Sequence, residues 1–564
     1  MSRLRPRYLV LIMSILIMVS GVALAASVQS GFGTVYVTEV DFQASDGSWI
    51  HSTLQRPIYA TDTNRLPGVV VIHGVIQCKE WLMAFGIELA RRGFVVLTID
   101  ANSHGNSEPG TGSGAAALDY LASLDYVDNS AIGLIGHSMG GGIAWSAIEE
   151  SSVNVDALVL VGSGLNRSEV PYVPNTLLAI GEFDALSPYP RNLTMLEGFF
   201  GVTGIEAGVT YGSFGDNTAR RIVLPRTNHL FETIDPTIVA ESVNWMKEGL
   251  KDGLEDSYWI ASGDQIYSLW LAGGFIGLLG LVLTQFPLLA IMIDLSPFHN
   301  LRTTHSTGRT IGNRAFLGLG VVYAAIGLGT FYPLLGVGLF IPFPQSYGGS
   351  IFLWILGSGL LSFFILKLIK RKRPQMISEI GMAINYAPRY IAITSLLAGI
   401  LAAWLYAWTL LVDLGLALDF RCFLPGFNDL TVARAIMVPI YVIPFLVYFF
   451  AESKWLIGAM RTEAKETWVG TQIHWTLKAI LIKCGPYFIL LILHYGYGMI
   501  TGLPLLPGLL GFSFLFLYAY GPWFAISTIM ILWGHHLTGQ YWLGSIVNAV
   551  LFSWVLASIL PIAF

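Results

Sequence analysis

Gly136-His137-Ser138-Met139-Gly140 is the stretch that decides the fold of this chain. It follows an apolar run, residues 131–135, that is typical of a buried strand, and it leads into residues 141–148, which have the pattern of a helix start. A serine at such a junction sits on a turn so tight that the residues two positions away on either side must be small. The stretch therefore predicts a strand, a sharp turn that presents Ser138, and a helix.

The composition divides the chain into two parts. Of the 564 residues, 54% are hydrophobic and 12% are charged, whereas soluble domains carry about 25% charged residues. Residues 39–264 hold 28 of the 36 acidic residues and 12 of the 31 basic ones. The first part thus has the composition of a soluble domain and the remainder that of a membrane protein. Because the soluble part is acidic, its charge argues against a nucleic-acid partner.

The first 27 residues have the form of a secretory signal. Residues 1–7 carry three arginines, residues 8–22 are apolar, and Ala23-Leu24-Ala25 resembles a cleavage site. The alternative is an uncleaved anchor helix, since residues 8–27 are just long enough to span a membrane. In either case we expect the domain that follows to be exported.

Residues 35–252 alternate strand and helix signals. Apolar runs that end in glycine or aspartate, such as residues 68–74 and 94–100, predict buried strands, and residues 81–92 have helical spacing. Continuous apolar strands between helices indicate a parallel sheet that is covered on both faces. The expected fold of this part is therefore α/β, doubly wound, with a mostly parallel sheet.

Residues 265–564 consist mainly of long apolar stretches. About eight have spanning length, which predicts an all-α domain of about eight transmembrane helices. They cover residues 266–293, 316–343, 351–369, 390–412, 435–451, 484–502, 508–533 and 542–562. No charged residue lies at the centre of any of these stretches. His494, His535-His536 and Asn548 are the remaining polar candidates, and helix packing or a short loop is the simpler interpretation of each.

The basic residues predict an orientation. If the soluble domain lies outside, the inner loops hold Lys370-Arg371-Lys372-Arg373 and most of the other lysines and arginines of this region, and the outer loops hold only Arg421 and Arg434. The sequence therefore predicts a multi-pass protein of the cell membrane with its soluble domain on the extracytoplasmic side.

The soluble domain resembles the α/β-hydrolase superfamily, specifically its serine esterase, lipase and peptidase branch. The resemblance covers roughly residues 35–250 and rests on four motifs: His73-Gly74-Val75, Asp100-Ala101-Asn102-Ser103-His104-Gly105-Asn106-Ser107, the turn at Ser138, and the late pair Asp184 and His229. The second motif departs from the family pattern at Ser103, where glycine is usual. The chain order of serine, acid and histidine is the one that this fold uses.

The resemblance implies a catalytic triad. Ser138 would be the nucleophile, His229 the base that takes its proton, and Asp184 the carboxylate that orients the imidazole. The backbone N–H groups of Val75 and Met139 would bind the oxyanion.

Other residues could take two of these roles. Glu182 is an alternative acid, and His73, His104 and His137 are alternative histidines, although only His229 follows the last expected strand, residues 221–225.

The sequence indicates no metal and no cofactor. The three cysteines, Cys78, Cys422 and Cys484, match neither a disulfide framework nor a zinc pattern, although a bridge between Cys78 and Cys422 stays open. Metal-ligand spacings and phosphate-binding loops are likewise not found in the sequence.

Together these features predict a membrane-integrated serine hydrolase that cleaves acyl esters, of lipids or lipid-like molecules, through an acyl-enzyme. Its expected partners are the bilayer and the ester substrate, and the sequence does not indicate an oligomeric state. A peptidase, an amidase or an acyltransferase with the same triad is an alternative. A transporter or lipid-handling module with an accessory hydrolase is an alternative of another class.

The predicted α/β domain lacks room for a cap over its active site. Only residues 163–175 separate the strand at 156–162 from the next one, so a helical lid does not fit there. We therefore expect the membrane domain to act as the lid or substrate platform. The outer loop at residues 414–433 is the expected surface, through Phe420, Phe423, Leu424 and Phe427.

Overall fold

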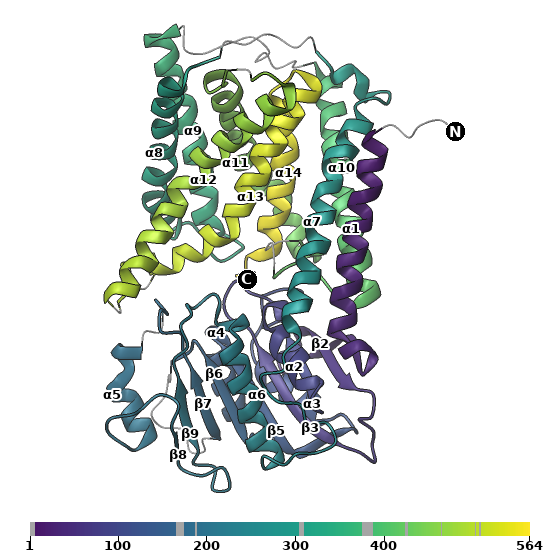
Figure 1. Ribbon diagram of the computed structural model, residues 1–564, viewed down its shortest axis with the longest axis vertical. Helices are drawn as coiled ribbons and strands as arrows, with labels where there is room; N and C mark the ends of the chain where they lie inside the picture. The colour runs from purple at the N-terminus through teal and green to yellow at the C-terminus, as the bar shows by residue number, and fades with distance from the viewer. Residues whose placement is uncertain are drawn as a thin grey trace.

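A computed structural model describes residues 6–164, 174–186, 189–303, 310–374, 387–422, 427–463, 465–501, 503–506 and 509–563. A globular α/β domain lies at one end of a bundle of long helices (Figure 1). The predicted fold class, a mostly parallel α/β domain joined to an all-α domain, is confirmed.

The α/β domain is built on a nine-stranded sheet in the order β1-β2-β4-β3-β5-β6-β7-β9-β8. The strands are β1 (Val35–Gln43), β2 (Trp49–Pro57), β3 (Leu66–Ile72), β4 (Val95–Ile99), β5 (Val127–His137), β6 (Ala157–Val161), β7 (Asn175–Ala179), β8 (Thr210–Tyr211) and β9 (Arg220–Val223). The central pairs from β4 to β9 are parallel, whereas β1, β2 and β8 pair antiparallel with their neighbours at the two edges.

Helices cover both faces of the sheet. α2 (Met83–Ala90) and α6 (Pro236–Lys251) contact each other on one face, and α3 (Ser113–Ala122) and α4 (Met139–Glu150) on the other. Side chains along a strand alternate between the faces. Val69 and Val71 of β3 accordingly pack in a core with α2 and α6, and Val70 and Ile72 in a core with α3 and α4. The first of these cores continues into the helical bundle.

Nine of the described helices are long and apolar enough to cross a membrane. Besides α1 (Pro6–Gln29), they are α7 (Tyr267–Met292), α8 (Asn313–Gly338), α9 (Gly348–Lys372), α10 (Pro388–Leu416), α11 (Val432–Ser453), α12 (Trp468–Thr501), α13 (Leu509–Thr538) and α14 (Trp542–Ile559). α7 to α14 fall on the eight apolar stretches of the sequence.

α1 packs along α7 at close range. A Cβ atom on Gly21 would lie 2.2 Å from the backbone nitrogen of Gly277, so this approach requires glycine. At the end of α1, Gln29 Oε1 accepts a hydrogen bond of 3.0 Å from Trp270 Nε1. α1 is thus packed against the bundle along its length.

The two ends of the bundle differ in charge. α9 begins beside the α/β domain, where Gln345 pairs with Ile562, and it carries Lys370, Arg371 and Lys372 to the opposite end. The two arginines expected in outer loops both lie at the α/β end, where they contact that domain. Lys370, Arg371 and Lys372 thus lie at the end of the bundle that is away from the α/β domain.

Two charged side chains lie inside the bundle, so the expectation that charges are absent from the centres of the spans was wrong. Lys483 Nζ lies 2.5 Å from Glu452 Oε1 and 2.8 Å from Ser527 Oγ, and both charged side chains are buried. α12 begins at Trp468, well before the apolar stretch 484–502, so Lys483 lies in the middle of the helix. Pairing across helices makes such charges tolerable in a membrane.

Candidate active site

Ser138 lies at the junction of β5 and α4 in a strained conformation. Its φ is 53° and its ψ is −118°, a region that residues with a side chain rarely adopt. A Cβ on Gly136 would lie 2.4 Å from the carbonyl oxygen of Gly140, and a Cβ on Gly140 would lie 2.2 Å from that of Ile72. The two glycines therefore allow the sharp turn that lifts the Ser138 hydroxyl above the carboxyl end of the sheet.

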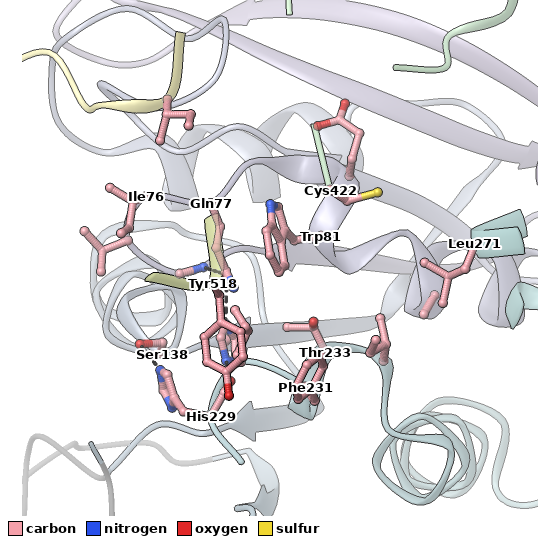
Figure 2. A pocket seen from close by; sticks show the side chains of 18 of the residues that line it. Ile76, Gln77, Trp81, Ser138, His229, Phe231, Thr233, Leu271, Cys422 and Tyr518 are labelled. Carbon is pink, nitrogen blue, oxygen red and sulfur yellow. Dashed lines mark hydrogen bonds between the residues drawn. The ribbon is translucent and has the colours of Figure 1, made fainter. Parts of the chain in front are cut away.

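Ser138, His229 and Asp184 form a continuous hydrogen-bonded chain. His229 Nε2 lies 3.0 Å from Ser138 Oγ (Figure 2). His229 Nδ1 lies 3.0 Å from Asp184 Oδ2. Asp184 is buried, and its second oxygen accepts a hydrogen bond of 2.7 Å from the Leu186 N–H. With the imidazole proton held on Nδ1 by the carboxylate, Nε2 can accept the serine proton.

The alternative residues lie elsewhere. The Glu182 side chain is 52% exposed and pairs with an arginine at the surface. His73 and His104 hydrogen-bond backbone groups, and His137 bonds the side chain of Gln77. Burial and the neighbouring His73 lower the pKa of His104 to about 3, so this ring is neutral at physiological pH. The structure therefore brings Asp184 and His229, rather than these residues, to Ser138.

The loop that follows β3 is also fixed beside Ser138. Gln77 Oε1 accepts a hydrogen bond of 2.8 Å from the Gly74 N–H and lies 2.9 Å from His137 Nδ1. Val75 lies in the pocket wall between Gly74 and Gln77. Met139 is the first residue of α4, and N–H groups in the first turn of a helix have no acceptor within that helix. Val75 and Met139 stay the predicted oxyanion donors: Val75 lines the cavity and Met139 follows Ser138 in the chain.

Sequence reasoning missed Glu232. Its Oε1 accepts a hydrogen bond of 2.6 Å from the Gly181 N–H, and its Oε2 lies 3.4 Å from His229 Nδ1. The side chain is fully buried. Burial and the nearby charge of Asp184 raise the pKa of Glu232 well above its usual value, which favours the protonated form of this side chain. Its spacing of three residues from His229 was the available signal, but an exposed helical glutamate has the same spacing.

His137, His229 and Glu232 could in principle hold a metal ion, since one ligand atom from each lies within 4.8 Å of the others. The nitrogen of His229 that faces Glu232 is Nδ1, which is already bonded to Asp184. An ion there would break that bond. The donor set therefore fits a protonated acid behind the imidazole better than a metal centre.

We expect Glu232→Gln to fold with nearly the stability of the wild type at neutral pH, because glutamine mimics a protonated glutamate. Glu232→Ala leaves the buried Gly181 N–H without an acceptor and should lower the free energy of unfolding by about 1–3 kcal/mol. A raised pKa means that the folded state holds this proton more tightly than the unfolded state. The proton on Glu232 therefore stabilises the folded state fully below about pH 4, near the pKa of an unfolded glutamate. This stabilisation declines as the pH rises toward the pKa of Glu232 in the folded state.

Thermal unfolding of the three proteins in detergent between pH 4 and pH 8 tests this. In Glu232→Gln, the loss of stability with rising pH that comes from ionisation of Glu232 should disappear. Equal destabilisation by glutamine and alanine would contradict a protonated Glu232.

A cavity of about 520 Å³ opens beside Ser138 and is walled by both domains. The α/β domain contributes Gly74, Val75, Gln77, Trp81, Ser138, His229, Phe231 and Ile234 among others, and the bundle contributes Trp270, Leu271, Ala272 and Phe275 of α7 and Phe516, Tyr518 and Tyr520 of α13. The ring centroids of Phe231 and Tyr518 lie 5.8 Å apart, edge to face, which closes the cavity across the domain boundary.

The wall of the cavity differs from the one expected from the sequence. Phe420 and Phe427 are buried in the core of the bundle, and Phe423 and Leu424 lie outside the described residues. Of the loop at 414–433, Cys422 is the described residue that lines the cavity, and it is a free thiol. α7 and α13 supply the wall instead, because their ends at the α/β domain lie directly against it.

The loop between α10 and α11 nevertheless enters the α/β domain through Arg421. Arg421 Nη2 donates to Glu80 Oε1 at 2.7 Å, and Nη1 donates to Asp100 Oδ2 at 3.3 Å. Lys79 Nζ lies 2.6 Å from the same oxygen of Glu80. Burial opposes ionisation, but Arg421 and Lys79 outweigh it and lower the pKa of Glu80 to about 2. A buried ion cluster therefore joins the two domains.

The motif that begins at Asp100 serves the same junction. Ser103, where the family pattern has glycine, has a φ of 70°. Its carbonyl oxygen accepts hydrogen bonds from Arg434 Nη2 at 3.1 Å and from the Ile562 N–H at 3.0 Å. Asn106 Nδ2 donates to Asp429 Oδ1 at 2.8 Å. The loop is thus bound by two segments of the bundle, one around the start of α11 and one after α14.

Comparisons with known proteins agree with this architecture. Residues 65–188 match the family described as serine aminopeptidase, S33. The chain is 27% identical over 198 residues to a bis(hydroxyethyl) terephthalate hydrolase of Streptomyces coelicolor, covering 34% of this chain and 60% of that protein. It is 30% identical over 139 residues to Lipase 1 of a Moraxella species, covering 24% and 43%.

The chain thus covers less than two thirds of either curated relative. Among solved structures, an esterase of Pyrococcus furiosus aligns at 14% identity over 39% of this chain and 96% of its own, with a TM-score of 0.31.

Proposed function

Because its globular part is an α/β-hydrolase domain, we propose that this protein is a membrane-integrated serine hydrolase that cleaves acyl esters. The observation that carries the proposal is the hydrogen-bonded chain from Asp184 through His229 to Ser138, which ends in the 520 Å³ cavity. A serine on a strained turn, a base within reach and a cavity that admits a substrate are the parts that acyl transfer needs.

The reaction would proceed in two steps. Ser138 Oγ attacks the ester carbonyl as His229 takes its proton, and the N–H groups of Val75 and Met139 bind the oxyanion. His229 then gives its proton to the departing alkoxide, which is released as an alcohol. The acyl group stays bound to Ser138 as an acyl-enzyme. A water molecule then attacks the acyl carbonyl as His229 takes its proton. The bond between the acyl carbon and Ser138 Oγ breaks, Oγ regains the proton from His229, and the acid is released. Asp184 stabilises the imidazolium in both steps.

The walls of the cavity favour an apolar acyl ester over a peptide. A free N-terminal amine needs an unpaired carboxylate, but Glu80, the carboxylate in the cavity wall, is already engaged by Arg421 and Lys79. Aromatic and aliphatic side chains of α7 and α13 instead offer apolar surface. The curated relatives include a lipase and an ester hydrolase by name.

We further propose that the helices lie in the cell membrane with the hydrolase domain on the extracytoplasmic side. The basic residues at the far end of the bundle support this orientation by the positive-inside rule. Arg421 and Arg434, the two basic residues expected in outer loops, are buried and contact the hydrolase domain.

A charged fluorophosphonate that cannot cross membranes tests both proposals on intact cells. We expect it to label the wild type at Ser138, as identified by peptide mass, and to leave Ser138→Ala unlabelled. Labelling only after the cells are permeabilised would place the domain on the opposite side. No labelling of the folded protein in detergent would show that Ser138 is not an activated nucleophile.

A further inference from the structure

We propose that the cavity beside Ser138 is the seat of an acyl chain that enters sideways from the bilayer, through an opening on α7 at Ala272 and Phe275. This inference rests on the proposed ester hydrolase and names its substrate class: the esterified acyl chain of a lipid that resides in the membrane.

The cavity reaches the outer surface of α7. Ala272 and Phe275 line it, yet both are exposed, and Phe275 keeps 57% of its surface accessible. Leu271 lines the same end and is partly exposed. A residue that both lines a cavity and faces outward lies at the mouth of that cavity.

The length of α7 sets the depth of this mouth in the proposed membrane placement. The helix has 26 residues, about 39 Å, which exceeds the hydrocarbon core of about 30 Å. Its first residue, Tyr267, contacts the α/β domain, so we infer that this end of α7 projects beyond the hydrocarbon. Phe275, eight residues or about 12 Å further along the axis, then lies at the outer edge of the acyl chains.

The chemistry of the cavity changes along its length. His229 and Ser138 lie at one end, and in Figure 2 Trp81 lies between this pair and Leu271. The α7 end is lined by Trp270, Leu271, Ala272 and Phe275, all of which are uncharged. Exposing an apolar groove to water is unfavourable in free energy. A groove that opens into lipid does not have this cost, because lipid tails are as apolar as its walls.

The geometry thus matches a substrate with a polar carbonyl and a long apolar tail. The carbonyl reaches Ser138 and the oxyanion donors, and the tail runs past Trp81 and Leu271 into the bilayer. A small water-soluble ester would leave the α7 half of the cavity unused. Hydrolysis returns the freed acyl chain to the membrane by the route through which it came.

Replacing Ala272 with tryptophan should block this route. In proteoliposomes we expect the ratio of kcat/KM for p-nitrophenyl palmitate to kcat/KM for p-nitrophenyl butyrate to fall by about tenfold or more, because the indole overfills the mouth. The matched control is Ala403→Trp, the same substitution at an exposed position of α10. It should leave the ratio at the wild-type value. An unchanged ratio for Ala272→Trp would overturn the portal.

A second measurement does not depend on catalysis. Vesicles of phosphatidylcholine with a diazirine in the acyl chain are irradiated with the reconstituted Ser138→Ala protein. We expect cross-links to Trp81 and Ile234, which belong to the hydrolase domain and line the cavity, and their loss in the Ser138→Ala/Ala272→Trp protein. Cross-links confined to the membrane helices would refute the route even in an active ester hydrolase. Cross-links to Trp81 without esterase activity would uphold the route and reject the proposed reaction.

Discussion

Replacing Ser138 with alanine is expected to lower kcat for p-nitrophenyl butyrate by about 10⁴-fold or more, since removal of a triad nucleophile has such an effect in other serine hydrolases. Among the residues that the structure describes, the hydrogen-bond partner of His229 Nε2 is the Ser138 hydroxyl, at 3.0 Å. Residual activity should reflect the oxyanion donors and substrate binding alone. Steady-state kinetics on the purified protein in detergent measure the effect.

A matched control separates chemistry from folding. Ser123→Ala removes a hydroxyl from an exposed position at the end of α3 and should leave kcat unchanged. Both variants should unfold at the wild-type temperature. Activity of Ser138→Ala within about tenfold of the wild type would show that the nucleophile lies elsewhere.

Arg421→Met is the substitution with the largest expected effect on stability. It leaves Glu80 and Asp100 buried without their guanidinium partner, and breaking a buried ion pair from one side costs about 3–5 kcal/mol. We expect a lower unfolding temperature in detergent and faster proteolytic release of the hydrolase domain. The rate of palmitate ester hydrolysis should also fall, because the hydrolase domain and the bundle, which form the two walls of the cavity, separate.

Two further variants serve as controls for Arg421→Met. Arg421→Lys keeps the charge but loses the two-pronged contact, and should fall between the wild type and methionine. Arg302→Met removes an arginine whose ion pair with Asp294 is partly exposed, and should cost less than about 1 kcal/mol. Equal effects of Arg421→Met and Arg302→Met would mean that the buried cluster does not hold the domains together.

The sequence predicted the parts of the molecule that depend on local pattern. Apolar runs such as residues 94–99 can be buried on both faces only as central strands, and the glycines around Ser138 are required by its turn. Expected and observed strands therefore agree in the centre of the sheet. The edge hairpin of β1 and β2 was not among the expected strands, because its residues mix polar and apolar types without a continuous run.

The missed features all depend on contacts between distant segments. Glu232 looks like any acidic residue until folding buries it beside His229, and Lys483 looks like a loop lysine until α12 extends through it. Likewise, hydropathy marks α7 and α13 as spans but does not reveal that their ends wall the cavity. Aromatic residues in a loop were the more visible signal, and they pack into the core of the bundle instead.

The packing of α1 against α7 has a consequence for biosynthesis. Roughly 240 residues separate the end of α1 from the start of α7, which corresponds to about 12–50 s of translation at 5–20 residues per second. During that interval the hydrolase domain leaves the ribosome before α7, the helix that will pack against α2, exists. α13 is made later still. A nascent chain thus presents Ser138 before the α7 and α13 walls of the cavity exist, so the proposed lipid cleavage requires nearly complete synthesis.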